Sequence, residues 1–259
     1  MTLGDWLAER PFALAMSSGF FSFFAHTGML DALTTSGLRP QLVAGSSAGA
    51  LVGAAYASGL EAAQLAERLV ALERRDFWDP RWGAGLLAGH KFDRILRELM
   101  PVHDAAGCRI PIKISVYDIL RRRTRVIDHG DLPVAVRASC AVPGMFHPVW
   151  MSSPAEPGGA TAKRRAYWDG GILDRPGLAG VPEGERVLFH HIAAPAPWSV
   201  KGPPIPRRTN MATLVLDALP RANPWRLEAG REALARARET VKRALELPIH
   251  DGVVRLAVR

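Results

Sequence analysis

Cysteine is scarce in this sequence. Only Cys108 and Cys140 occur among 259 residues, which excludes a disulfide framework, and they form no C-x-x-C pair of the kind that holds a metal. The His, Asp and Glu residues show no metal-ligand spacing either, so we expect no metal and no other cofactor. So little cysteine suits a reducing compartment. The expected location is the cytoplasm, either free or peripheral to a membrane.

A long uninterrupted hydrophobic run is also missing. The nearest approach is Pro11–Leu30, which has about the length of a membrane span but contains His26, several serines and internal glycines. No basic region precedes it, as a signal peptide would require. We therefore predict a buried strand at Phe12–Met16, a tight turn, and a helix that ends near Ser36.

Acidic residues are outnumbered by basic ones. The chain has 33 Lys and Arg against 25 Asp and Glu, a formal net charge of +8 and a sequence pI of about 10.2. Such an excess favours an anionic partner. Nucleic acid is not expected, because the basic residues show no aromatic interleaving and no known nucleic-acid-binding module. An anionic membrane surface is the remaining candidate.

The sequence does contain a pair of serines framed by glycine and alanine, V-A-G-S-S-A-G-A at Val43–Ala50. The apolar run Gln41–Ala44 predicts the end of a buried strand, and Ala48–Ala57 predicts a helix. The junction is a G-x-S-x-G pattern, in which only small residues fit two places before and after the central serine. Ser47 is therefore the candidate nucleophile, at a helix N-terminus whose dipole favours negative charge. The alternative is an ordinary glycine-rich turn, since the pattern also arises by chance.

A second candidate is Asp169, in the turn Y-W-D-G-G at Tyr167–Gly171. The two glycines let the backbone turn tightly, so the carboxylate can point into a site. Such a turn alone is usually structural. It gains weight from the preceding segment R-A-S-C-A-V-P-G-M-F-H-P-V at Arg137–Val149.

Four stretches together resemble the patatin-like phospholipase family, lipid acyl hydrolases that use a Ser–Asp dyad. In chain order they are the first strand and turn before A-H-T-G-M-L-D-A-L, the elbow G-S-S-A-G-A-L-V-G-A-A-Y-A-S-G, the segment R-A-S-C-A-V-P-G-M-F-H-P-V, and D-G-G-I-L-D-R-P-G-L. The resemblance implies a three-layer α/β sandwich around a mainly parallel sheet. It also implies that Ser47 is the nucleophile, that Asp169 is the general base, and that the substrate is a lipid or other ester.

The chemistry of this dyad is coherent in itself. A serine hydroxyl needs a nearby base to attack an ester, and an aspartate with an ordinary pKa of about 3.9 is a weak one. We expect burial in an apolar site to raise that pKa. A Ser–Asp–His triad is the rival, because Ser47, Asp169 and His190 or His191 occur in that order. Triad enzymes of that order have several strands before the elbow, whereas this chain has room for about one. We therefore interpret both histidines as strand-end residues.

The family pattern is broken in one place. The family has a glycine-rich loop with a following basic residue, G-G-G-x-R/K-G, after the first strand, where this chain reads S-S-G-F-F-S-F. In one alignment Ser18, Gly19 and Phe20 take the glycine places and Ser22 the basic one, and a shift of one residue fits equally well. Main-chain N–H groups stabilise an oxyanion whatever the side chain, so these first three residues are the expected oxyanion hole. Glycine-only backbone angles would be strained at a phenylalanine, and the lost basic residue removes a partner for a lipid phosphate.

Four phenylalanines beside this loop have two interpretations. Phe20, Phe21, Phe23 and Phe24 form the wall of an acyl pocket or a membrane-dipping edge, or they pack in the core, which we favour for Phe24. His26 on the same helix is interpreted as a structural histidine.

Further along, the pattern predicts alternating helices and strands. The expected helices are Leu60–Arg75, Lys91–Leu99 and Leu132–Cys140, and the expected strands are Pro111–Tyr117, Val126–Asp128 and Arg186–Ile192. The basic run Arg121–Arg125 is interpreted as a solvated hairpin tip.

Composition changes near residue 194. The proline-rich stretch Ala194–Arg208 predicts a linker, and from Asn210 onward we expect helix with a basic surface. We therefore divide the chain into a patatin-like catalytic domain at 1–200 and a basic helical C-terminal extension at 201–259. The extension is either a solvated helical face or a means of holding anionic lipid.

The sequence thus predicts a serine acyl hydrolase that cleaves lipid esters through an acyl-Ser47 intermediate. One alternative is a catalytically weak or inactive relative that binds a membrane or a partner protein. Another keeps the acyl-enzyme but passes the acyl group to an acceptor other than water. The lipid headgroup, the chain length and the oligomeric state are not encoded in any pattern that we recognise.

Overall fold

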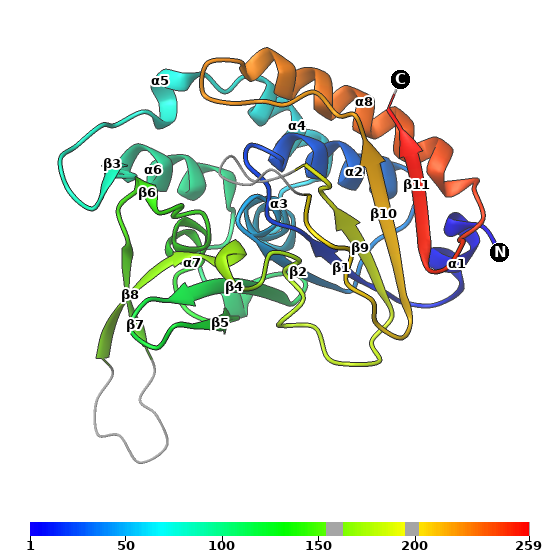
Figure 1. Ribbon diagram of the computed structural model, residues 1–259, viewed down its shortest axis with the longest axis horizontal. Coiled ribbons are helices and arrows are strands. Elements are labelled where there is room, and N and C mark those ends of the chain that lie inside the picture. Colours follow the sequence, from blue (N-terminus) through cyan, green and yellow to red (C-terminus); the bar gives the residue numbers. More distant parts are fainter. Residues whose placement is uncertain (154–162, 195–201, 259) are drawn as a thin grey trace.

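A mainly parallel β-sheet runs through the molecule, as the computed structural model shows for residues 1–153, 163–194 and 202–258 (Figure 1). Its strand order is β11-β10-β9-β1-β2-β4-β8-β7, with β5 also paired to β4. Neighbours from β11 to β4 are parallel, whereas β5, β7 and β8 are antiparallel additions. The strands are β1 (Ala13–Met16), β2 (Leu42–Ser46), β4 (Ile112–Asp118), β5 (Arg123–Ile127), β7 (Val149–Ser153), β8 (Lys163–Asp169), β9 (Val187–His191), β10 (Met211–Asp217) and β11 (Val253–Ala257). The expected α/β class with a mainly parallel sheet is confirmed.

Helices cover one face of this sheet (Figure 1). A separate two-stranded ribbon pairs β3 (Gly85–Leu87) with β6 (Gly144–Phe146). Within the described part of the chain, no helix combines the length and the apolar character needed to cross a bilayer. The helices are α1 (Leu3–Glu9), α2 (Phe23–Thr35), α3 (Ala48–Ala57), α4 (Ala62–Val70), α5 (Arg74–Phe77), α6 (His90–Leu99), α7 (Leu132–Ser139) and α8 (Leu227–Leu245).

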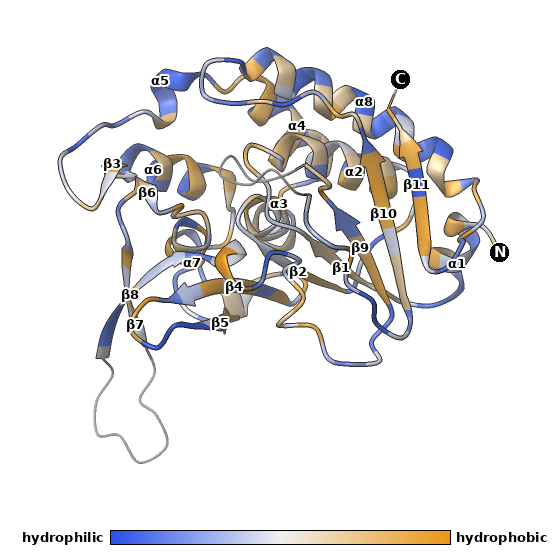
Figure 2. Ribbon diagram, viewed as in Figure 1, coloured by the Kyte–Doolittle hydropathy of each residue, from blue (hydrophilic) through white to orange (hydrophobic). Residues whose placement is uncertain are grey.

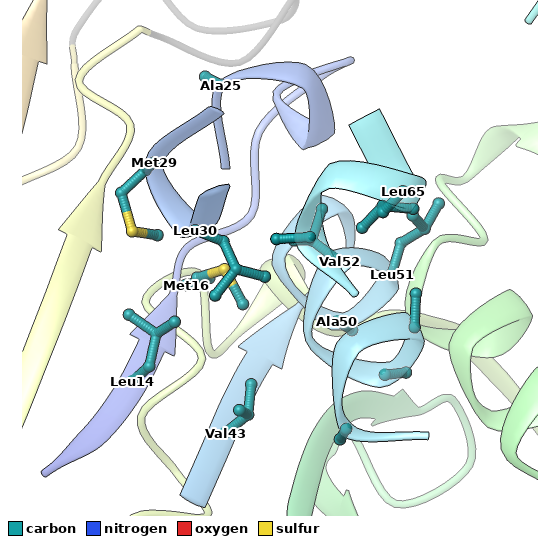
Figure 3. Close-up of a cluster of buried hydrophobic side chains, with 14 of the residues drawn as sticks. Leu14, Met16, Ala25, Met29, Leu30, Val43, Ala50, Leu51, Val52 and Leu65 are labelled. Carbon is teal, nitrogen blue, oxygen red and sulfur yellow. The ribbon is translucent and has the colours of Figure 1, made fainter. Parts of the chain in front are cut away.

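The main core lies between the sheet and helices α2 and α3 (Figure 3). β1 is buried along its whole length, as expected for a strand with parallel neighbours on both sides. α3 lies close to β2, since a Cβ added at Gly53 would come within 2.6 Å of the Val43 side chain. On the opposite face, Leu178 and Val181 from the segment before β9 cover the alanines of β1 and β2. This close approach of α3 to β2 fixes the start of α3 against the end of β2.

The C-terminal part differs from the expectation. We predicted helix from Asn210 onward, but β10 and β11 extend the central sheet, and only α8 is a long helix. Figure 2 shows both strands as largely hydrophobic, and their apolar runs fit a buried position in the sheet. α8 packs on α2 so closely that a Cβ at Gly28 would lie 2.2 Å from the Leu234 carbonyl oxygen. The predicted boundary at residue 200 falls within 195–201, outside the described residues, and stays a prediction. The same holds for that part of the predicted proline-rich linker, whereas its residues 202–208 are in neither helix nor strand.

Two smaller expectations are also corrected. The helix predicted at Leu60–Arg75 is two helices, α4 and the short α5. The second strand of the hairpin begins at Arg123 rather than Val126, so the basic run is partly strand and only partly hairpin tip. The remaining predicted helices and strands before residue 193 agree with the structure to within about two residues, the usual uncertainty of element ends.

Candidate active site

Ser47 occupies the sharp turn between β2 and α3. Its backbone angles, φ 51° and ψ −116°, lie in a region that side-chain-bearing residues rarely adopt. The flanking glycines are sterically required, because a Cβ at Gly45 would lie 2.5 Å from the Gly49 carbonyl carbon and one at Gly49 would lie 2.1 Å from the Met16 oxygen. The turn therefore has the geometry that the G-x-S-x-G pattern predicted. It costs about 1–3 kcal/mol in backbone strain.

Two other segments hold this turn in place. The Ser47 N–H donates to the Ser139 hydroxyl at 2.8 Å, and the Ser139 hydroxyl donates to the Ser115 carbonyl at 2.7 Å. The end of α7 and the middle of β4 thereby support the elbow. The sequence reasoning did not single out Ser139. The signal that could have identified Ser139 is its position in the segment R-A-S-C-A-V-P-G, which resembles the family.

Asp169 lies at the end of β8, where the chain turns into a short 3₁₀ helix at Gly170–Ile172. Its N–H donates to the Ala141 carbonyl at 3.0 Å, and its Oδ1 accepts from the Gly171 N–H at 2.7 Å. The two glycines are tightly packed, since a Cβ at Gly170 would lie 2.0 Å from the Ser115 oxygen. The carboxylate is thus fixed by its own turn, with Oδ2 buried and without a hydrogen-bond partner among the described residues.

Burial raises the pKa of Asp169 to about 6, as the sequence reasoning required. The Ser47 hydroxyl, the Gly171 N–H and the Arg175 charge each act in the opposite direction and lower that pKa. The Ser47 hydroxyl is therefore a close neighbour of the carboxylate, even though Oδ2 lacks a hydrogen bond of normal geometry. A carboxylate with this pKa is a better base near neutral pH than an ordinary aspartate.

An apolar cavity opens beside these two side chains. Both Ser47 and Asp169 line it, and most of its wall is hydrophobic, including Phe20, Phe21 and Phe23. Helices α4 and α6 contribute leucine and isoleucine side chains. Phe24, by contrast, is fully buried in the core, as we favoured. The cavity has the apolar lining that an acyl chain requires.

The loop after β1 supplies part of the wall. The Ser18 N–H donates to the Arg175 carbonyl at 2.7 Å, so it is already bonded and is not available to an oxyanion in this conformation. The N–H groups of Gly19 and Phe20 make no hydrogen bond to the described residues. Of the three N–H groups expected to form the oxyanion hole, these two are therefore the ones without a bond in this conformation. The strained phenylalanine is Phe21, with φ 55°, rather than Phe20. This placement agrees with the alternative alignment shifted by one residue.

Two further side chains in the cavity were missed as site residues. Cys140 is a free thiol whose pKa is raised well above its ordinary value by burial and by the Asp169 charge, while the Ser47 hydroxyl lowers it. Arg175 lines the cavity six residues after Asp169, in the D-R-P sequence that follows the double-glycine turn. Cys140 and Arg175 reach the cavity only because distant segments of the chain meet there. The one signal for them in the sequence was that each lies in a segment that resembles the family.

The histidines lie elsewhere. His26 Nδ1 contacts His190 Nδ1 at 2.8 Å, and His26 Nε2 contacts the Ser17 carbonyl at 2.8 Å. Burial lowers the pKa of His26 to about 4 and that of His190 well below its ordinary value. His191 ends β9, and no histidine is among the described residues that line the cavity. The structure therefore brings together Ser47 and Asp169 but not a histidine.

The chain resembles known proteins in sequence and in fold. The profile of the Patatin-like phospholipase family matches residues 14–180. The chain is 33% identical over 165 residues to the Uncharacterized NTE family proteins Rv1063c of Mycobacterium tuberculosis and Mb1092c of Mycobacterium bovis, covering 62% of this chain and 43% of each relative. It thus spans less than half the length of these curated relatives. The crystal structure of VipD from Legionella pneumophila superimposes with a TM-score of 0.52 at 13% identity, over 91% of this chain and 67% of that one, which shows a shared fold.

Proposed function

The chain belongs to the patatin-like phospholipase family, and from that premise we propose that it is a serine acyl hydrolase that cleaves carboxylic esters of lipids. The observation that carries the proposal is the position of Ser47 on a strained elbow beside the buried Asp169, in an apolar cavity. The activity of the longer relatives as whole proteins is not implied by this match.

In the proposed reaction Asp169 takes the proton of the Ser47 hydroxyl while the oxygen attacks the ester carbonyl. The resulting oxyanion accepts hydrogen bonds from the N–H groups of Gly19 and Phe20 and lies at the positive end of α3. The alcohol then leaves with the proton from Asp169, and the acyl group stays on Ser47. The same carboxylate then takes a proton from water while the water oxygen attacks the acyl ester, and it returns this proton to Ser47 Oγ as the bond to the fatty acid breaks. A single carboxylate therefore acts as the base both when the acyl-enzyme forms and when it is hydrolysed.

Three features support this assignment. The Asp169 pKa of about 6 leaves the carboxylate mostly ionised at neutral pH and still basic enough to accept a proton. The apolar wall provides a place for the acyl chain. The two glycines around Ser47 are needed only because strand and helix nearly touch there, which is the condition for exposing the hydroxyl at the cavity.

The proposal includes an anionic lipid surface as partner. A second hollow between α4, α5 and α6 is lined by four cations, Arg68, Arg75, Lys91 and Arg94, and by two acidic residues, Asp76 and Glu98. It shares apolar side chains of α4 and α6 with the acyl cavity, and Arg75 is paired with Glu73. Neither Arg68 nor Arg94 forms an ion pair with the described residues. A surface that offers these cations next to the cavity wall suits anionic headgroups.

The C-terminal segment offers fewer free cations than its composition suggests. On α8, Arg236 pairs with Glu232 and Lys242 with Glu239, while Arg238 contacts the buried Asp31. Because the basic hollow adjoins the acyl cavity, we propose it rather than α8 as the membrane contact.

The decisive experiment treats purified protein with a fluorophosphonate probe and a short p-nitrophenyl ester. The wild type is expected to label and to turn over, whereas Ser47→Ala should lose both. Ser46→Ala is the matched control, because the Ser46 hydroxyl is fully buried and has no hydrogen-bond partner in the described structure. Absence of labelling in a folded wild type would favour the inactive, partner-binding alternative. Transfer of the acyl group to an added alcohol in preference to water would favour the acyltransferase alternative.

A further inference from the structure

Arg175 is a partly buried cation at the cavity that the mechanism above does not use. Its side chain lines the same cavity as Ser47 and Asp169. A guanidinium has five N–H donors, and one of them, on Nη2, donates to the Ala194 carbonyl at 2.7 Å. The Nε atom is buried and has no hydrogen-bond partner in the described part of the chain. Because a buried donor without an acceptor is unfavourable, an anion is expected at this place.

The nearest carboxylate does not fill this role. The charges of Asp169 and Arg175 influence each other's pKa, which shows that the groups are close. Yet no ion pair joins them among the described residues, and Asp169 Oδ2 is itself without a partner. The positive charge of Arg175 therefore remains available to a ligand in the cavity.

The guanidinium is also held in position. The Arg175 carbonyl accepts the Ser18 N–H at 2.7 Å, so its main chain is tied to the loop after β1. At the other end of the side chain, Nη2 is tied to the segment after β9 through Ala194. A cation fixed at both ends loses little conformational freedom when it binds an anion.

The position of Arg175 is significant because the loop itself lacks a cation. In the two alignments with the family pattern the place of the arginine or lysine falls on Ser22 or on Phe23, and neither side chain is charged. Arg175 belongs instead to the segment that follows the double-glycine turn, which is hydrogen-bonded to this loop through the Ser18 N–H. Among the described residues that line the cavity, Arg175 is thus the one cation, although it does not come from the expected segment.

We propose that Arg175 forms an anion subsite beside the dyad, and that it binds the phosphate of a phosphorylated alcohol whose acyl ester is cleaved at Ser47. This inference rests on the proposed hydrolase function. An arginine binds a phosphate through its charge and through paired N–H donors, and the Arg175 guanidinium at the cavity has Nη donors besides the one that is bonded to the Ala194 carbonyl. The acyl chain lies in the apolar part of the cavity and the phosphate on the leaving alcohol lies at Arg175. The preferred substrate class is therefore a monoacyl phosphoester lipid rather than a neutral glyceride.

The test compares two substrates that differ only in the phosphate, octanoylglycerol and its phosphate monoester, each below its critical micelle concentration. The wild type should prefer the phosphorylated substrate in kcat/KM. Arg175→Gln should reduce that preference by about 10- to 100-fold, the range typical of hydrogen bonds to charged groups, mainly through KM. Arg175→Lys keeps the charge but not the paired donors, so it should retain only part of the preference.

Arg255→Gln is the matched control for loss of one positive charge. Like Arg175, Arg255 lies near His191 and lowers the pKa of that residue, but its side chain is 53% exposed, pairs with Asp217 and does not line the cavity. The substrate preference of this variant should equal that of the wild type. If the role of Arg175 were purely structural, Arg175→Gln would instead lower the melting temperature and reduce kcat/KM equally for both substrates.

Binding to the inactive Ser47→Ala protein separates the subsite from turnover. This variant should bind the phosphorylated lipid more tightly than the neutral one, and Ser47→Ala/Arg175→Gln should lose the difference. Inorganic phosphate is tested as a competitor and should compete only weakly. Competition as strong as that of the phosphorylated lipid would mean that the subsite recognises the free ion and not the lipid. Equal binding of both lipids, or a preference unchanged by Arg175→Gln, overturns the subsite even when the wild type is an active hydrolase. Failure of Ser47 to label with the lipid preference intact would instead overturn the hydrolase and leave the subsite.

Discussion

The main-chain N–H of Ser47 donates a hydrogen bond to the side-chain hydroxyl of Ser139, 92 positions further along the chain. Ser139 donates in turn to the Ser115 carbonyl. Ser139→Ala would leave both backbone groups unpaired in a buried place, at a cost of about 1–3 kcal/mol in the free energy of unfolding. We expect a lower melting temperature and, because the elbow loses its support, a lower kcat. Ser46→Ala, which breaks no hydrogen bond, should match the wild type in both measurements.

The pH profile of kcat/KM should report the ionisation of Asp169. The base must be deprotonated to act, so kcat/KM is expected to fall as the pH drops through about 6. An acid limb near pH 4 would show that the carboxylate is solvated rather than buried. Asp169→Asn should remove activity across the whole range while the far-UV circular dichroism stays that of the wild type.

The same raised pKa makes a prediction about stability. In the unfolded chain Asp169 ionises near 3.8, whereas in the folded protein it holds its proton up to about 6. Folding is therefore opposed as the pH rises from about 4 to about 6, and the penalty above that range is roughly 3 kcal/mol at most. Asp169→Asn should unfold at higher denaturant concentration than the wild type at pH 7 and at the same concentration near pH 3.5. A variant less stable than the wild type at pH 7 would contradict the burial of the charge.

A triad enzyme and a dyad enzyme respond differently to loss of a histidine. His191→Gln should keep kcat within a few-fold of the wild type, because this residue does not line the cavity. His190→Gln removes the partner of His26 and should lower the melting temperature, with kcat of the folded fraction retained. A well-folded His191→Gln protein without activity would restore the triad interpretation.

The loop after β1 can be tested with a pair of compensating substitutions. A Cβ at Gly19 would lie 2.3 Å from the Ser22 Oγ and 2.8 Å from its Cβ, so Gly19→Ala must displace the loop and its N–H donors. Loss of one oxyanion donor typically lowers kcat by about 10²–10³-fold. Ser22→Gly removes both clashing atoms, and the double variant Gly19→Ala/Ser22→Gly should recover most of the lost rate. An unchanged kcat in Gly19→Ala would mean that the loop does not contact the oxyanion, and additive losses in the double variant would mean that the clash with Ser22 is not what displaces the donors.

Vesicle binding should distinguish the two basic surfaces. Arg68→Gln/Arg94→Gln removes two unpaired cations from the basic hollow, at about 1 kcal/mol each near an anionic surface. Affinity for acidic vesicles should fall by roughly 30-fold, whereas turnover of a soluble ester should change little. Arg236→Gln/Lys242→Gln, which removes cations already paired on α8, should have the smaller effect. Binding in every case should weaken as salt is added. Equal effects of the two double variants, or salt-independent binding, would contradict the assignment.

Much of the site could be predicted from short stretches of sequence because its constraints are local. The turn at Ser47 requires small residues two places on either side, and the turn after Asp169 requires glycine at the next two positions. Because these steric requirements fall on residues within a five-residue stretch, each turn can be recognised from the local sequence. The first strand, the elbow helix and the mainly parallel sheet follow from the same local rules, together with the resemblance to a known family.

Other features are decided only when distant segments meet. The apolar run at β10 could be a strand or a buried helix by its pattern, and its pairing with β9 decides the matter. The support of Ser47 by Ser139 and the approach of Arg175 to the cavity depend on contacts across more than 90 positions. The strained backbone lies at Phe21 and not at Phe20 because packing of the whole loop sets its angles. The sequence by itself thus determined the two turns that carry Ser47 and Asp169. Tertiary packing decided the pKa of Asp169, the hydrogen bonding of the loop after β1 and the approach of Arg175, since burial and charge at a point depend on every segment that surrounds it.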